Sequence, residues 1–265
     1  YNHLLMLDGK HTSLLNQAQD VVSNPIETNG NSDEIVKKVL SCGTYEKAFR
    51  KFVKLTPNSK KISIDHIVSA VILYYSSFSK YQADFDDAMN KKKNLTEDAV
   101  KGFNIFMSKA QCGTCHFVPM FNGVKPPYTG SEFEVAGTPV DTLFTKLSPD
   151  IGRALINPAG EMMHAFRTGT IRNAAHTGPY MHNGIYKTLD EVIRFYDTGG
   201  GAGNGLKVIN QTLSPDSLKL SSPEKKQLIA FIHSLDEQIQ FETAPTSLPA
   251  SNNKSLNTRK VGGEY

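Results

Sequence analysis

The chain has 265 residues, enough for one large domain or two small ones, and its 39% hydrophobic and 21% charged residues exclude a wholly disordered chain. A net charge of +3, from 29 basic and 26 acidic residues, is too small to indicate nucleic-acid binding. No run approaches the roughly 18 consecutive apolar residues of a membrane helix. We therefore expect a soluble protein or a soluble part of one.

Helical periodicity dominates the first hundred residues. Apolar positions with an acidic first turn predict a helix over residues 32–40, and apolar residues at spacing four continue over 45–53. The strongest helical pattern covers residues 63–78. The lysine-rich stretch 90–94 is typical of a solvated connector. Thr96 then caps another helix, which leads the chain to Cys112.

The second half of the chain alternates long loops with short helices. Residues 117–165 are rich in Gly, Pro and Thr, which predicts a long loop with short helical turns. A helix is expected over 189–196, and the glycines of 199–205 should end it. Ser222, as N-cap with Pro in the first turn, opens the last helix. Beyond Glu242 the composition predicts a tail or a wrapping strap.

One pentapeptide carries recognisable chemistry. Cys112 and Cys115 form a C-x-x-C pair followed at once by His116, the attachment motif of c-type haem. The two thiols can form thioethers to one porphyrin edge, and the adjacent imidazole can ligate the iron. A zinc knuckle would need a second ligand pair, a thioredoxin-like pair would need a βαβ context, and a disulfide would leave His116 unexplained. The remaining Cys42 is interpreted as a small buried apolar residue.

A second axial ligand to the iron should come from far along the chain. A methionine would raise the reduction potential for electron transfer, but spacing alone does not choose among the candidates. These are Met162, Met163, Met181, His164, His176, His182 and Tyr196.

The sequence resembles the bacterial dihaem cytochrome c peroxidases and their MauG-like relatives from about Met6 to Leu235. The pieces that carry the resemblance keep their order and spacing together, which makes the match more specific than any one of them. They are Leu7-Asp8-Gly9-Lys10, Ser13-Leu14 with Gln17-Ala18, Asn24-Pro25-Ile26-Glu27, the haem pentapeptide, Phe166-Arg167-Thr168, Ile171-Arg172-Asn173, Thr177 to Gly184, and Leu189 to Val192. The resemblance implies an all-α fold of cytochrome-c-like helical haem domains.

The family has two such domains, each with one haem. Residues 1–90 would be the remaining part of the peroxidatic domain, residues 91–240 the second haem domain, and residues 241–265 a C-terminal tail. The family's first C-x-x-C-H should precede Asp8 and is missing from these residues. We therefore expect one haem c attached here and a second from a segment lost by truncation, cleavage or disorder. A natural single-haem form is the alternative.

The resemblance also implies catalytic residues. Gln17 and Glu27 match the polar residues that line the peroxide pocket of the family's first haem. A carboxylate in a low-dielectric pocket has its pKa raised toward the working pH, which suits Glu27 to move a proton between the two peroxide oxygens. Gln17 can donate a hydrogen bond but cannot carry a proton. From the residues alone, Glu27 is equally well an acid before the helix at residue 32.

Three further positions bear on the haems. Tyr196 stands where peroxidases of the family place Met and MauG-like proteins place Tyr, and a phenolate would lower the potential relative to Met. A core aromatic is the other interpretation of Tyr196. Leu7 occupies the position of a Trp between the haems, so electron exchange through that Trp is not expected. Thr177 and Pro179 match positions whose carbonyl groups bind calcium between the domains.

The predicted function is reduction of hydrogen peroxide with electrons from a small cytochrome c or cupredoxin. Because haem is attached outside the cytoplasmic membrane, the expected location is the periplasm, and a homodimer is compatible with the family. MauG-like oxidation of a partner protein is the alternative enzyme activity, and a single-haem electron-transfer cytochrome is the non-enzymatic alternative.

Overall fold

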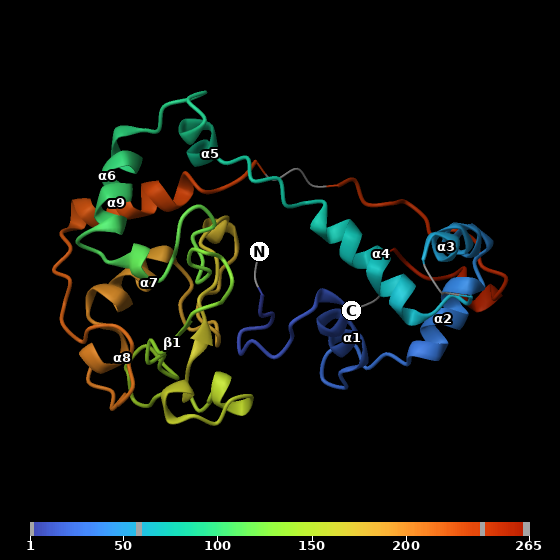
Figure 1. Cartoon of the computed structure of the whole chain (residues 1–265), viewed down its shortest axis with the longest axis horizontal. Helices are drawn as coiled ribbons and strands as arrows, with labels where there is room; N and C mark the ends of the chain where they lie inside the picture. The colour runs from blue at the N-terminus through green and yellow to red at the C-terminus, as the bar shows by residue number, and fades with distance from the viewer. Residues whose placement is uncertain (1–2, 57–59, 239–241, 262–265) are drawn as a thin grey trace. The chain divides into compact units, whose positions relative to one another are not determined.

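The computed structural model describes residues 3–56, 60–238 and 242–261, and within them the chain is helix-rich and forms two compact units (Figure 1). Residues 13–80 and 242–261 form one, here called the four-helix unit; residues 3–12 and 81–238 form the other, here called the motif unit because it carries Cys112 to His116. No helix of the described residues is long and apolar enough to cross a membrane.

The four-helix unit follows the predicted periodicity closely. Ser13 caps its first helix by accepting a hydrogen bond from the Asn16 amide, and Asn31 caps its second by accepting from Glu34. The strong apolar pattern from residue 63 forms the longest apolar helix, which packs on the other three. The helices are α1 (Leu14–Ser23), α2 (Ser32–Leu40), α3 (Gly43–Leu55) and α4 (Ile64–Ser76).

The C-terminal residues return to the four-helix unit. The Asn252 amide donates to the Ser41 carbonyl over 2.7 Å, and the hydroxyl groups of Ser41 and Ser251 are 2.7 Å apart. Ser251 is buried by these contacts at the junction of α2 and α3. Residues 242–261 are therefore a strap on this unit. The predicted boundary between residues 240 and 241 lies outside the described residues.

The motif unit is built on two helices that lie side by side, α6 (Glu97–Met107) and α9 (Ser222–His233) (Figure 1). Gly102 allows their close approach, because a Cβ at this position would stand 1.9 Å from the Gln227 carbonyl oxygen. Around this contact Phe106 and Phe231 pack edge to face, 5.1 Å between ring centroids. The other elements are α5 (Asp84–Met89), β1 (Phe133–Glu134), β2 (Phe166–Arg167), α7 (Leu189–Asp197) and α8 (Gly200–Gly203).

The structure corrects two helix boundaries in the motif unit. The N-cap of α9 is Ser221 and not Ser222, because Ser221 and Glu224 form a reciprocal capping box three residues apart. The glycines after α7 do not simply end it, since they form the short helix α8. Glycine is required there: a Cβ at Gly201 would lie 2.1 Å from the Gly137 carbonyl oxygen, so only bare backbone fits against that loop.

The division of the chain also differs from the predicted one at residue 90. Residues 81–90 belong to the motif unit because the Phe85 ring joins its aromatic core and the Asp86 carboxylate pairs with Arg172. Residues 3–12 belong to the same unit, since the Arg167 and Arg153 side chains bind their backbone carbonyl groups. Which unit corresponds to which haem domain stays a prediction.

A buried ion pair fixes α5 to the motif unit. The two terminal nitrogens of Arg172 donate to the two carboxylate oxygens of Asp86 over 2.7 and 2.8 Å, and the second oxygen also accepts from the Ala83 amide. Burial raises the pKa of Asp86, but the hydrogen bonds from Arg172 and Ala83 outweigh it and hold the pKa below the ordinary value of 3.8. The pair therefore contributes stability wherever Asp86 is ionised.

Replacement of Asp86 by Asn should lower the free energy of unfolding by about 3 kcal/mol, because it leaves the Arg172 guanidinium buried without its anion. The difference from the parent protein should be full above pH 3.8 and should shrink as the pH falls through the lowered pKa of Asp86. Denaturant titrations at several pH values measure both. Glu97→Gln, which removes an exposed i,i+4 pair with Lys101, is the control and should leave stability unchanged. An equal effect of both substitutions would contradict the role of the buried pair.

Candidate haem site

The predicted attachment pentapeptide lies in a short turn directly after α6. Residues 112–114 form one turn of 3-10 helix, and the amides of Cys115 and His116 both donate to the Cys112 carbonyl. Gly113 packs against Met107, where a Cβ would meet the methionine sulfur at 2.6 Å. Both cysteines carry free thiols, and their side chains are partly exposed. The turn thus presents the two sulfur atoms unpaired, as attachment to haem requires.

The His116 imidazole is held in the tautomer that an iron ligand needs. Its Nδ1–H donates to the Phe121 carbonyl oxygen over 3.1 Å, which leaves the lone pair on Nε2. Burial lowers the pKa of His116, and hydrogen bonding to the backbone of Phe121 and Gly169 opposes that shift only in part. The ring is therefore neutral near pH 7, as a metal ligand requires.

The thiols lie in an environment that keeps them protonated. Burial raises the pKa of Cys112 to about 12 and that of Cys115 to about 11, and the carboxylate of Glu134 on β1 adds to the second shift. Thiolate is the reactive form of cysteine, so both groups are protected from oxidation in the chain without haem.

Tyr196 is brought to the same place by α7, although 80 residues separate it from His116. Burial raises the pKa of its phenol, and the charges of Cys115, Cys112 and Glu134 raise it further. The phenol is therefore within electrostatic range of both attachment thiols. The structure thus brings together four of the sequence-predicted residues: Cys112, Cys115, His116 and Tyr196.

The competing histidine candidates are already engaged elsewhere in the motif unit. His182 stacks on Phe166 with ring centroids 3.9 Å apart, and its Nε2 lies 2.9 Å from the Ser148 hydroxyl. His164 donates from Nδ1 to the Asp150 carbonyl, and its charge lowers the pKa of His182, so these two rings are neighbours. His176 faces the carboxylate of Asp236 at 3.6 Å.

The competing methionines are exposed or partly exposed to solvent. Met163 is exposed, its carbonyl accepting a hydrogen bond from Asn210, while Met162 and Met181 are partly exposed. Tyr196, by contrast, has its pKa raised by the charges of both attachment thiols. Tyr196 as the second axial ligand stays a prediction.

Gln17 and Glu27 lie in the four-helix unit, in surroundings that differ from the predicted pocket. Gln17 is partly buried on α1. Glu27 is exposed, and one of its carboxylate oxygens accepts a hydrogen bond from the Asn24 side chain over 3.2 Å. The described residues of this unit do not by themselves enclose Glu27, and its role in a peroxide pocket stays a prediction.

The predicted calcium positions form no recognisable ion site by themselves. Thr177 and Pro179 are exposed, and the Thr177 hydroxyl donates to the Ala174 carbonyl over 3.3 Å. In the described part of the chain, no group of three or more His, Cys, Asp or Glu side chains could hold a metal ion. Calcium bound through carbonyl groups stays a prediction.

The motif unit also contains buried polar atoms without a partner, which sequence patterns did not indicate. Buried side-chain polar atoms that lack a hydrogen-bond partner all fall in the motif unit, within the described ranges: Ser131 Oγ, Arg167 Nη1, Thr168 Oγ1, Tyr186 OH and Asp236 Oδ1. Such atoms are rare in folded proteins, because leaving one unpaired costs about 1–3 kcal/mol. Two free thiols, a neutral His116, and the buried donors Arg167 Nη1 and Thr168 Oγ1 close in sequence to Gly169, whose backbone contacts His116, together fit haem c, whose propionates are anionic acceptors. Arg167 and Thr168 belong to the Phe166-Arg167-Thr168 piece of the resemblance, which is the sequence signal that could have pointed to them.

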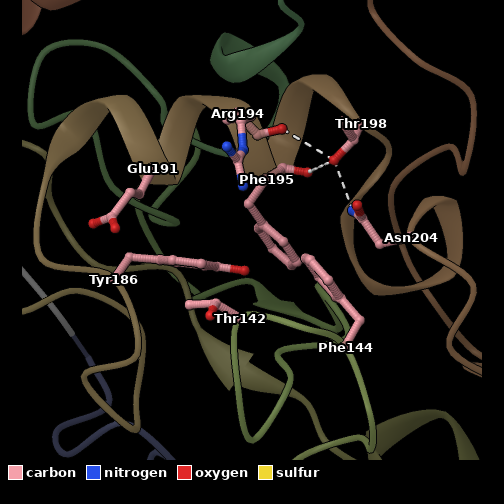
Figure 2. A pocket seen from close by; sticks show the side chains of 8 residues that line it. All are labelled: Thr142, Phe144, Tyr186, Glu191, Arg194, Phe195, Thr198 and Asn204. Carbon is pink, nitrogen blue, oxygen red and sulfur yellow. Dashed lines mark hydrogen bonds between the residues drawn. The ribbon is translucent and has the colours of Figure 1, made fainter.

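A cavity of about 230 Å³ flanks α7 next to this site (Figure 2). In its wall, the Phe195 ring packs against the rings of Phe144 and Tyr186. The Phe195 ring also lies 5.3 Å from the Tyr196 ring, centroid to centroid. The Tyr186 hydroxyl points toward Phe195 in this view, and burial raises its pKa to about 12. None of the sequence-predicted site residues lines the cavity; its walls are Thr142, Phe144, Tyr186, Glu191, Arg194, Phe195, Thr198 and Asn204.

Comparisons with known proteins agree on one family. A family model described as di-haem cytochrome c peroxidase matches residues 1–94, which include Gln17 and Glu27. Cytochrome-c peroxidase IdrP2 of Pseudomonas sp. (strain SCT) is 31% identical over 185 residues, covering 64% of this chain and 48% of that protein. The methylamine utilization protein MauG of Methylorubrum extorquens is 27% identical over 245 residues, covering 91% of this chain and 62% of that protein.

Solved structures with a similar fold include a MauG-like protein. The crystal structure of a MauG-like protein associated with microbial copper homeostasis superposes with a TM-score of 0.74 at 22% identity, covering 90% of this chain and 73% of that one. The chain spans about half to about two thirds of the length of the curated relatives it matches.

Replacing Cys112 and Cys115 together by Ala should remove one covalently held haem, since only these sulfur atoms stand one turn apart beside a neutral histidine. Mass spectrometry of the denatured chain, isolated from cells that mature c-type cytochromes, measures the loss. Cys42→Ala is the matched control and should retain the full haem mass, because Cys42 is buried in the other unit. An unchanged mass in the double variant would exclude attachment at this turn.

Proposed function

Because this chain belongs to the family of dihaem cytochrome c peroxidases and MauG-like proteins, we propose that it is part of a periplasmic haem peroxidase that reduces hydrogen peroxide. Its electrons come from a small redox protein, a cytochrome c or a cupredoxin. The observation that carries the proposal is the convergence of Cys112, Cys115, His116 and Tyr196 on one site. A second haem c, beyond the one held here, belongs to the proposal.

Haem supplies a site for peroxide and a store of oxidising equivalents when bound, and the residues of the motif unit determine how it is held. Cys112 and Cys115 fix the porphyrin edge, and the Phe121 carbonyl orients His116 toward the iron. The Tyr196 phenol is protonated in the chain without haem, because burial raises its pKa. A ferric ion favours the ionised form of a bound group, so coordination would offset this shift.

The surface of the four-helix unit supports a second haem. Among its described residues only Cys42, His66, Val68 and Ser251 are fully buried, whereas α4 and the residues just after it expose an apolar stripe. This stripe contains Val71, Leu73, Tyr74, Tyr75 and Phe78. An exposed apolar patch of this kind marks a surface that something covers, and a porphyrin has a matching apolar face.

In this proposal Glu27 and Gln17 act on peroxide at the second haem. A carboxylate oxygen of Glu27 accepts the proton from one peroxide oxygen and returns it to the departing one, and Gln17 donates its amide N–H to the departing oxygen. The proposal therefore requires that the second haem, by covering this region, replaces the solvent that now surrounds Glu27.

Glu27→Gln should abolish peroxide turnover and leave the haem content unchanged, because an amide keeps the shape but cannot accept the proton. Turnover is measured with a reduced cytochrome c donor, and haem is counted as the pyridine haemochrome of the intact protein. The control is Glu34→Gln, an exposed acid in the first turn of α2, which should keep full turnover. Unchanged turnover in Glu27→Gln would reduce Glu27 to a helix-terminal acid, and one haem per chain would favour an electron-transfer cytochrome.

MauG-like oxidation of a partner protein is the second candidate, and Tyr196 is the observation that favours it. A phenolate is a hard anionic donor that stabilises ferric and higher oxidation states of iron, which suits storage of an oxidising equivalent better than simple electron relay. The two activities would differ in the molecule that is oxidised: a small redox protein in the first, a side chain of a partner protein in the second.

Tyr196→Phe should change the ferric haem spectrum and raise the reduction potential, because the ring is preserved and only the ligating oxygen is removed. Absorption spectroscopy and a spectroelectrochemical titration measure both changes. Tyr186→Phe is the matched control, since this neighbouring tyrosine also has a buried hydroxyl but should leave the spectrum unaltered. An unaffected spectrum in Tyr196→Phe would point instead to Met162, Met163 or Met181 as the ligand, and to an ordinary peroxidase.

A further inference from the structure

Arg167 on β2 is a partly buried cation for which the described residues supply no anion. Its Nε donates to the Met6 carbonyl over 3.1 Å, and its backbone amide donates to the Leu7 carbonyl over 2.8 Å. Its Nη1 is buried and has no hydrogen-bond partner among these residues. Burial alone lowers the pKa of the guanidinium, with no carboxylate contributing to stabilise the charge. Buried arginines are normally paired, so an anionic partner is expected here.

The neighbouring carboxylates do not fill this role. Glu132 forms an ion pair with Lys125, and Glu134 acts on the thiol of Cys115. Neither contributes to the pKa of Arg167. The two carbonyl contacts of Arg167 anchor residues 6 and 7, but they leave the charge itself unneutralised.

The position of Arg167 within the motif unit identifies the missing anion. In the register of the β1–β2 pair, Phe166 lies opposite Glu134, whose carboxylate acts on Cys115. Two residues after Arg167, the backbone of Gly169 hydrogen-bonds the ring of His116. Arg167 therefore sits in the segment that passes between an attachment thiol and the iron ligand. The adjacent Thr168 also has a buried hydroxyl without a partner.

We propose that the guanidinium of Arg167 binds a propionate carboxylate of the haem attached at Cys112 and Cys115, with the Thr168 hydroxyl as a second donor. A guanidinium fork matches the two oxygens of a carboxylate, and such charge-assisted pairs are stronger than neutral hydrogen bonds. Since Nε holds the Met6 carbonyl at the same time, Arg167 is a positioning residue that ties residues 6 and 7 to the haem edge. This inference requires haem at this turn but is independent of any peroxidase activity.

The reduction potential of this haem as a function of pH tests the inference in the haem-bound protein. A protonated propionate raises the potential, so the potential falls with rising pH where the propionate ionises. In Arg167→Gln that fall should move to higher pH by about 1–3 units, the shift expected on losing an adjacent opposite charge. Arg167→Lys should move it less, because lysine keeps the charge but not the fork. The signal is assigned to this haem by its loss in the variant with both Cys112 and Cys115 replaced.

Arg153→Gln is the matched control. Arg153 also binds the N-terminal segment, donating from Nη1 to the carbonyls of Asp8 and Gly9 over 3.1 and 2.8 Å, so its loss loosens the same segment without removing the proposed partner. The inference predicts a pH profile like that of the parent protein for this control. It is overturned if Arg167→Gln and Arg153→Gln behave alike, or if the potential of Arg167→Gln shifts equally at every pH. The Arg167→Lys variant decides the matter should Arg167→Gln fail to accumulate.

Discussion

The haem site depends on one hydrogen bond, from His116 Nδ1–H to the carbonyl of Phe121. The acceptor is immobile because the Phe121 ring is fully buried, 5.1 Å from Phe85 and 5.6 Å from Phe231, centroid to centroid. Its backbone adopts a left-handed conformation, which costs about 1–2 kcal/mol. Burial of the ring, worth about 2–3 kcal/mol, offsets that cost. The same aromatic core that packs α6 on α9 thus orients the imidazole.

In the motif unit, burial is the main cause of the shifted pKa values at the haem site. The thiols and phenols gathered there are kept protonated, and His116 is kept neutral, because burial disfavours every charged form. Arg167 is the exception, since a guanidinium keeps its proton in any protein environment. Among its described residues the unit therefore holds neutral ligands for a metal together with the partly buried cation of Arg167, a combination that a group with both an iron and carboxylates would satisfy.

The four-helix unit presents the opposite situation. Its helices are well capped and follow their amphipathic patterns, yet few of its described side chains are fully buried. Local signals are sufficient to form such helices, whereas a core requires apolar surface on both sides of each contact. The apolar stripe of α4 is exposed because this unit has few buried side chains to pack against it. Glu27 is exposed for the same reason, so its surroundings are not those of a buried acid.

The sequence by itself determined the helices and the attachment motif, because both depend on short spacings along the chain. The periodicity over 32–40 and the C-x-x-C-H run needed no tertiary information. It did not determine that residues 81–90 pack with the motif unit, since the partner of Asp86 lies 86 positions further on. Nor did it reveal that burial raises the pKa of Tyr196 or that Arg167 carries an unpaired charge. Those properties depend on which groups surround a side chain in space, and only the folded chain decides that.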